Sequence, residues 1–205
     1  PYQVGQLAIF KNLTGSVNIE GTTQELAYYM PSIYVLNGDN EQGTGHLGNI
    51  TLTDQNLEAQ SFRISQTDFN DIHNILGHIT SDYQLHISQI DGEQGLIDVV
   101  TTLGGLVNKP TNYTLASIDT SANIEAAINR NPPDINTPER DIYDAIIGHI
   151  VSITASDADP VHTNIDGAEF LRSHGFVGNY AVTDSVENIL SHESATRNAV
   201  SVSLE

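Results

Sequence analysis

The sequence predicts a mixed α/β fold, in which short strands and short helices form internally duplicated strand–helix–strand units behind an irregular N-terminal segment. Two observations predict it. Blocks of sequence recur along the chain, and within them apolar residues switch between alternating and helical spacing. Units of this kind bury their apolar faces by stacking on their neighbours, so we expect a solenoid-like arrangement.

The duplication rests on four pairs of matching blocks. The pairs are GHLGNITLTD (45–54) with GHIVSITASD (148–157), DIHNILGHI (71–79) with DIYDAIIGHI (141–150), QIDGEQGLI (89–97) with NIDGAEFL (164–171), and NYTLASIDTSANI (112–124) with NYAVTDSVENI (179–189). They divide the chain into an N-terminal strand-rich segment at 1–66, a first copy at 67–130 and a second copy at 131–205. The ITLTD and ITASD stretches alternate apolar and polar residues, which predicts strands.

Each copy contains one helix ahead of a glycine. Thr67 and Thr137 precede acidic, apolar-periodic segments, and Pro138 occupies a first helical position, so both threonines are predicted N-caps. The helices should end at Gly77 and Gly148, because glycine readily adopts the left-handed conformation that closes a helix.

A second, shorter helix is predicted in each copy. Asp119 and Asp184 are the candidate N-caps, and Ile124 with Ile128, or Val186 with Leu190, would form its apolar stripe. In the N-terminal segment, YQVGQLAIF (2–10) predicts a strand, TTQELAYYM (22–30) a short helix and SIYVL (32–36) a buried strand.

Three histidines follow a glycine and precede a leucine or isoleucine, namely His46, His78 and His149. An imidazole at a helix C-terminus can satisfy the last carbonyl groups and interacts favourably with the helix dipole. The sequence therefore favours a structural role over metal binding for them, since no pair of histidines shows the i, i+4 spacing of a zinc helix.

The composition restricts the classes of partner. The formal charge is −19, with 26 acidic against 7 basic residues, and such a surface repels phosphate backbones and anionic lipids. We therefore expect neither nucleic-acid binding nor membrane insertion. The chain has no cysteine, which removes disulfides and thiolate chemistry and favours a secreted, extracellular or cell-surface protein.

The blocks NYTLASIDTSANIEAAI, NYAVTDSVENIL and ITLTD resemble tandem repeats with the approximate pattern Y-x-V-x-D-T-A-A-N-I followed by S-I-T-L-T-D. Such repeats occur in very large secreted bacterial surface proteins, which include adhesins and proteins with calcium-binding repeats. The resemblance covers about half of the chain and implies an extracellular structural or adhesive module without known catalysis. Val186 and Glu187 depart from the pattern, and the G-G-x-G-x-D calcium nonapeptide is absent.

Acidic turns are the candidate metal ligands, because calcium prefers hard oxygen donors on flexible loops. The candidates are Asp39, Glu41, Asp91, Glu93, Asp157, Asp159, Asp166 and Glu169. Solvated turn acids are the alternative interpretation, since none of these loops reproduces the twelve-residue calcium loop. Ca²⁺ is the one cofactor that the sequence suggests.

No catalytic motif is evident. The serine nucleophile pattern G-x-S-x-G and the zinc pattern H-E-x-x-H are both missing, so we expect no enzyme. The leading hypothesis is a structural module of a bacterial surface layer, filament or adhesin. NAVSVSLE (198–205) alternates as a strand does and has few flanking charges, so self-association through terminal strands is expected. A calcium- or glycan-binding module is the alternative, and a secreted hydrolase is the third hypothesis.

Overall fold

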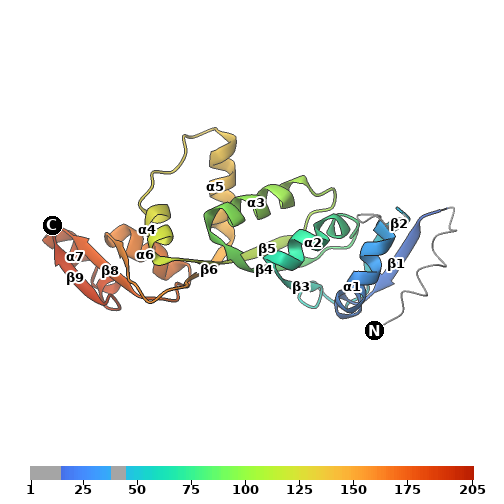
Figure 1. Ribbon diagram of the computed structural model, residues 1–205, viewed down its shortest axis with the longest axis horizontal. Helices are drawn as coiled ribbons and strands as arrows, with labels where there is room; N and C mark the ends of the chain where they lie inside the picture. Colours follow the sequence, from blue (N-terminus) through green and yellow to red (C-terminus); the bar gives the residue numbers. More distant parts are fainter. Residues whose placement is uncertain (1–14, 38–44) are drawn as a thin grey trace. The chain divides into compact units, whose positions relative to one another are not determined.

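The computed structural model describes residues 15–37 and 45–205 and shows a mixed α/β fold, as the sequence predicts. The chain divides into two compact units (Figure 1). Unit 1 contains residues 1–86 and 102–113, and unit 2 contains residues 87–101 and 114–205. The solenoid-like arrangement and the segment boundaries at residues 66 and 130 stay predictions.

Unit 1 contains two strand–helix pairs. Its complete elements are β1 (Val17–Gly21), α1 (Thr23–Asn37), β2 (Leu47–Leu52), β3 (Ser61–Ser65) and α2 (Gln66–Leu76). Strands β1 and β2 pair in parallel, and Ile50 of β2 forms a parallel bridge with Ile79. Phe62 and Tyr83 pack edge to face in the core of this unit, where both are buried.

Three elements have residues in both units, namely β4 (Gln84–Asp91), α3 (Gly92–Gly105) and β5 (Asn112–Asp119). The strand order of the four-stranded sheet is β3-β4-β5-β6, with β5 and β6 parallel.

Unit 2 ends in a three-stranded parallel sheet with the order β7-β8-β9. Its remaining elements are α4 (Ser121–Ile128), α5 (Pro138–His149), β6 (Ile150–Ala155), β7 (Val161–Thr163), α6 (Ile165–Ser173), β8 (Tyr180–Asp184), α7 (Val186–Ser191), α8 (Glu193–Thr196) and β9 (Ser201–Leu204). Its core contains Leu115, Val161, Ile165, Leu171 and Val182.

A local side chain caps the N-terminus of several helices. In α1 the hydroxyl of Thr22 accepts from the backbone N–H of Glu25 at 3.2 Å, and the Glu25 carboxylate accepts from the Thr22 N–H in return. Thr120 accepts from the Asn123 N–H at the start of α4, and Asn164 accepts from the Gly167 N–H at the start of α6. In each helix, the capping residue satisfies the N–H group three positions later.

An aspartate from the following parallel strand completes the same caps. The carboxylate of Asp54, just after β2, accepts from both the backbone N–H and the hydroxyl of Thr23 at 2.7 Å. Asp157, just after β6, accepts from the N–H and the hydroxyl of Ser121. Both aspartates are the final residue of the recurring block GHLGNITLTD or GHIVSITASD, so this recurring residue has the same contact in both places.

A third aspartate makes the same contact with a helix N-terminus, and a fourth lies close to the first residue of another helix. Asp184, at the end of β8, accepts from the N–H of Ile165 at 3.0 Å. Asp119, at the end of β5, lies against Gly92, the first residue of α3, where a Cβ would stand 2.6 Å from the Asp119 Oδ2. Gly92 also has a positive φ of 60°, so both the close approach and the backbone conformation favour glycine.

Three of the four matched pairs form the same kinds of element, whereas residues 89–91 end β4 and the matching residues 164–166 cap and begin α6. Several predicted helix ends were also wrong. Thr137 caps α5 and is followed by Pro138, as predicted. The N-cap of α2 is Ser65, two residues before the predicted Thr67, because Ser65 and Asp68 form a capping box and the helix begins at Gln66. α2 ends at Leu76 with Gly77 as its C-cap, as predicted, but Gly77 has a right-handed φ of −63°. α5 continues through Gly148 to His149. Neither glycine therefore supplies a left-handed helix end.

The second helices begin one residue later than predicted. Thr120 and Ser185 are the N-caps, while Asp119 and Asp184 precede them and bind the side-chain amides of Asn123 and Asn188. Ile124 is buried, as an apolar stripe requires. The predicted stripe of α7 is wrong, because Val186 is 52% exposed and Leu190 is 77% exposed.

The predicted strand SIYVL is also wrong, because α1 continues through residues 32–36 to Asn37. Its Leu26, Ile33 and Leu36 are buried at helical spacing, so the apolar run belongs to one long helix. Strand β1 at Val17–Gly21 was not predicted, and YQVGQLAIF lies outside the described residues. The strands predicted in ITLTD, ITASD and NAVSVSLE are present as β2, β6 and β9.

Removing the Ser121 hydroxyl should destabilise unit 2. Ser121 is only 2% exposed, and Ser121→Ala leaves the Asp157 carboxylate without its hydroxyl donor. We expect the free energy of unfolding to fall by about 1–3 kcal/mol. Ser156→Ala is the matched control, because Ser156 is exposed one residue before Asp157. Urea denaturation of both variants measures the difference, and equal effects would show that the cap contributes nothing specific.

The same contacts make stability depend on pH. The Ser121 hydroxyl lowers the pKa of Asp157, and the Ile165 N–H lowers the pKa of Asp184. A lowered pKa in the folded state stabilises the fold above the ordinary aspartate value of about 3.9, and the stabilisation is lost as the pH falls through the lowered value.

We therefore expect the melting temperature to drop between about pH 5 and about pH 3. The Asp184→Asn variant should have a lower melting temperature than the wild type at pH 6, and its melting temperature should change less as the pH falls. Thermal melts followed by circular dichroism measure this. An unchanged slope in Asp184→Asn would remove Asp184 as a cause.

Candidate functional site

A cavity of about 410 Å³ lies within unit 2, between α3, α4, α5, α6 and the strands β5 and β6. Its walls are mainly aliphatic, with Leu96, Ile124, Ile128, Ile146, Ile150 and Ile153 among them. Ile146 comes from the end of α5, and Ile150 and Ile153 come from β6. The register of β6 against β5 shifts between Ile150 and Ser152, and this irregularity interrupts the strict alternation of β6, so that both isoleucines line the cavity.

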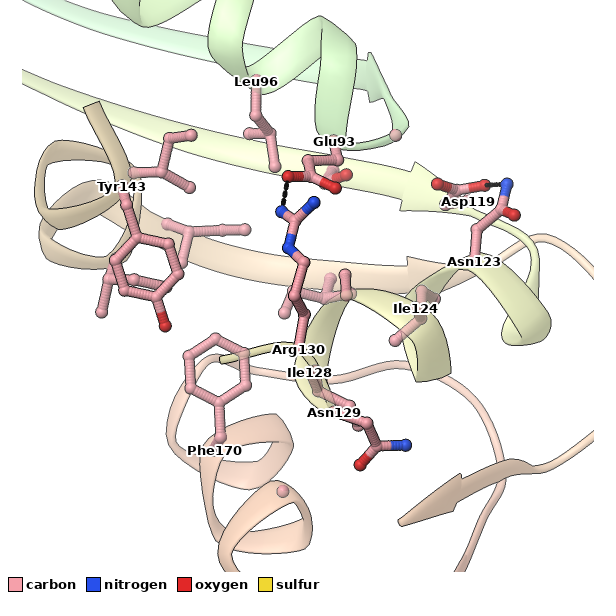
Figure 2. A pocket seen from close by; sticks show the side chains of 18 of the residues that line it. Glu93, Leu96, Asp119, Asn123, Ile124, Ile128, Asn129, Arg130, Tyr143 and Phe170 are labelled. Atoms are coloured by element: carbon pink, nitrogen blue, oxygen red, sulfur yellow. Dashed lines mark hydrogen bonds and ion pairs between the residues drawn. The ribbon is translucent and has the colours of Figure 1, made fainter. Parts of the chain in front are cut away.

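Two aromatic rings lie in the same wall. Tyr143 comes from α5 and Phe170 from α6, and Figure 2 shows both rings on one side of the cavity. Each ring already contacts another side chain. The Arg140 guanidinium stands 5.7 Å from the Tyr143 ring centroid, and the His174 ring lies 4.2 Å from that of Phe170.

An ion pair crosses the cavity mouth. The side chain of Arg130, just after α4, extends to the Glu93 carboxylate in the first turn of α3 (Figure 2). The two side chains are 57% and 39% exposed. An ion pair this exposed contributes at most about 1 kcal/mol to stability, so its main effect here is to place both charges at the opening.

The two other carboxylates that line the cavity, Asp119 and Asp166, differ in the hydrogen bonds that they accept. Asp119 accepts from the Thr120 N–H and the Asn123 amide, both at 2.7 Å. Asp166, in the first turn of α6, lines the cavity but makes no hydrogen bond or ion pair with the part of the chain that the structure describes. The mouth therefore has one carboxylate available to a ligand.

The structure distributes the predicted metal ligands over separate places. Asp91 ends β4, and Glu93 follows it in α3 with Arg130 as its partner. Asp157 and Asp159 lie in the loop between β6 and β7, where Asp157 already caps α4. Asp166 and Glu169 are exposed on α6, and Asp39 and Glu41 lie outside the described residues.

Within residues 15–37 and 45–205, no three histidine, aspartate or glutamate side chains are grouped so that they could hold a metal ion. Calcium binding therefore stays a prediction, and its strongest remaining place is the 156–160 loop. Asp159 is exposed there, two residues after Asp157.

The three histidines that follow a glycine lie at chain turns. His149 is the last residue of α5, and His46 immediately precedes β2. The Nδ1 atom of His78 lies 3.0 Å from the Gly48 carbonyl oxygen, so the ring donates a hydrogen bond to the backbone of a strand that precedes it by 30 residues. These positions agree with the structural role that the sequence favours.

The cavity could not be predicted from the sequence. Its apolar residues fit stripes that face a common core, and its carboxylates fit candidate calcium ligands (Glu93, Asp166) and a helix N-cap (Asp119). The lining comes from elements spread over 92–170, so only the packing of four helices brings it together.

Comparison with protein-family models, curated proteins and solved structures found no match. The residues that the structure describes include no helix long and apolar enough to cross a membrane.

The calcium hypothesis can be tested by melting. We expect calcium to raise the melting temperature more than magnesium does at equal concentration, because flexible carboxylate loops suit the larger ion. Asp159→Asn should remove the excess without disturbing the Asp157 cap, while Glu169→Gln should leave it unchanged. Equal shifts with both ions would reflect charge screening of a chain at −19 and would contradict specific calcium binding.

Proposed function

We propose that the protein is a non-enzymatic structural module of an extracellular or cell-surface assembly, such as a surface layer, filament or adhesin. The observation that carries this proposal is the open edge of β9. This strand pairs in parallel with β8, from Ala181–Ser201 to Asp184–Leu204, and among the described residues it ends the strand order of its sheet. Figure 1 shows β8, β9 and α7 together near the C-terminus.

Exposed apolar residues accompany this edge. Val200 is 57% exposed, Val202 44% and Leu204 63%, and all four residues of β9 are exposed. The outer N–H and C=O groups of an edge strand are a template for another strand, and natural proteins commonly block such edges with charges or prolines. Residues 199–204 include neither, so the edge is suited to strand addition.

The proposed partner is a second copy of this chain. A second β9 related by a twofold axis would close a dimer, whereas a different strand of the next copy would continue the assembly into a filament. A role in a surface layer or filament requires the second arrangement. Light scattering distinguishes them, because only the filament continues to grow as the concentration rises.

Charge opposes this association and makes it sensitive to salt. Each copy has a formal charge of −19, so two copies repel one another at low ionic strength. At about 0.15 M salt the Debye length falls to about 8 Å, and contacts along a strand edge are then less disfavoured. An assembly that uses β9 should therefore strengthen with added salt.

A calcium- or glycan-binding module is the alternative function, and the acidic 156–160 loop is the feature that favours calcium. A secreted hydrolase is less well supported. The carboxylates of Asp54, Asp157 and Asp184 bind helix N-termini, where they serve the fold.

A single charged substitution tests whether assembly uses the edge of β9. Val202→Lys places a cation in the centre of the strand, and we expect it to abolish assembly while the monomer remains folded, because a charged edge strand resists pairing. The lysine reduces the negative charge of the chain, so added repulsion cannot explain the loss. Light scattering at rising concentration, in low and high salt, measures assembly, and circular dichroism monitors folding.

Val186→Lys is the matched control, because Val186 is 52% exposed on α7 and lies outside the strand. It should leave assembly intact. If both lysine variants abolish assembly, a general apolar patch is responsible and the strand edge is not. If the wild type remains monomeric in high salt, with and without calcium, self-association through β9 is wrong.

A further inference from the structure

The cavity of unit 2 has the size and chemistry of a small-molecule site that is independent of β9. We propose that it binds a small organic cation, namely an amine with an apolar body. The apolar body would lie between the aliphatic wall and the ring of Phe170, and the ammonium group would lie at the mouth, beside Asp166.

The volume and the walls suit such a body. Ligand pockets typically enclose about 300–1,000 Å³ and have apolar walls with a few polar groups that fix the orientation. The cavity of about 410 Å³ lies at the lower end of this range. An apolar body of about ten non-hydrogen atoms gains from leaving water here, in proportion to the apolar surface that it buries.

The charge at the mouth selects the sign of the ligand. Glu93, Asp119 and Asp166 line the cavity against the single guanidinium of Arg130. Arg130 is paired with Glu93, and Asp119 is satisfied by Thr120 and Asn123, so Asp166 is the carboxylate without a partner in the described residues. An anionic ligand would meet this surplus of carboxylates and a chain charge of −19, whereas an ammonium group would be attracted.

Asp166 and Phe170 are placed to act together. They are four residues apart on α6, so they lie on the same face of the helix, and both line the cavity. An ammonium group that pairs with Asp166 can therefore place its apolar body against the Phe170 ring. The nearby Arg140 is itself paired with Asp144 at 2.8 Å, so it does not reverse the balance of charge.

Three probes of equal shape test the preference for a cation. 4-Phenylbutylammonium, 4-phenylbutanol and 4-phenylbutyrate share a phenyl ring and four chain carbons, and they end in a cationic, a neutral and an anionic group. We expect the ammonium probe to bind the intact chain most tightly, the alcohol less tightly, and the carboxylate at least about fivefold more weakly than the ammonium. Calorimetry or NMR titration measures the three affinities. Equal affinities, or no binding of the ammonium probe at millimolar concentration, would overturn the proposal.

Two pairs of variants locate the binding. Ala127 lines the cavity, whereas Ala126 is exposed beside it on α4. Ala127→Phe should fill the cavity and weaken the ammonium probe at least about tenfold, which corresponds to about 1.4 kcal/mol. Ala126→Phe should leave its affinity unchanged. If Ala127→Phe does not fold, Ile147→Trp tests the same wall.

Asp166→Asn should weaken the ammonium probe about two- to fivefold and leave the alcohol unchanged, as expected for one exposed charge pair. Glu169→Gln, on the same helix outside the cavity, should change neither. If Ala127→Phe, or Ile147→Trp in its place, has no effect, or if Asp166→Asn weakens both probes equally, the proposed site or its charge selectivity is wrong. Assembly through β9 has a separate measurement, because Val202→Lys should leave the affinity for the ammonium probe unchanged.

Discussion

The unsatisfied N–H groups at the starts of the helices are the constraint on which the rest of the structure depends. A helix that follows a parallel strand begins at the carboxyl edge of the sheet, and its first N–H groups have no partner within the helix. A local Thr or Asn satisfies one group, and an aspartate of the next strand satisfies the first. The carboxylate also favours the positive end of the helix dipole. Each contact ties a helix to a strand 19 to 36 residues later.

This arrangement changes how the acidic composition is interpreted. The sequence indicates Asp157 as a candidate calcium ligand and Asp119 and Asp184 as N-caps of the helices that follow them. In the fold, these three and Asp54 each lie against the N-terminus of a helix that precedes them in the chain. A carboxylate that accepts from backbone N–H groups is stabilised as an anion, so part of the acidic surplus belongs to the architecture. The same contacts make an aspartate at the strand end more valuable than a glutamate, whose longer side chain would have to be ordered at a greater entropic cost.

The sequence predicted the elements of the fold better than it predicted their ends. Apolar spacing correctly indicated α2, α5 and the strands at ITLTD, ITASD and NAVSVSLE, because those patterns are local. SIYVL was wrong, since a short apolar run fits a buried strand as well as a helix, and only the continuous α1 decides between them. The aspartate contacts could have been found by one further step. If ITLTD lies parallel to the strand before α1, its terminal Asp54 must reach the same sheet edge at which α1 begins.

The edge of β9 can be predicted from the sequence, whereas the cavity cannot. Alternation in residues 199–204 already indicates a strand with few blocking charges, because an edge is a property of one segment. A cavity is a property of side chains from many elements, and a one-residue change of register in β6 would turn Ile150 and Ile153 away from it. Its existence therefore depends on the same caps that fix where α4, α6 and their neighbouring strands begin and end. The caps thus specify the site indirectly, by holding two helices and a strand in the register that leaves space between them.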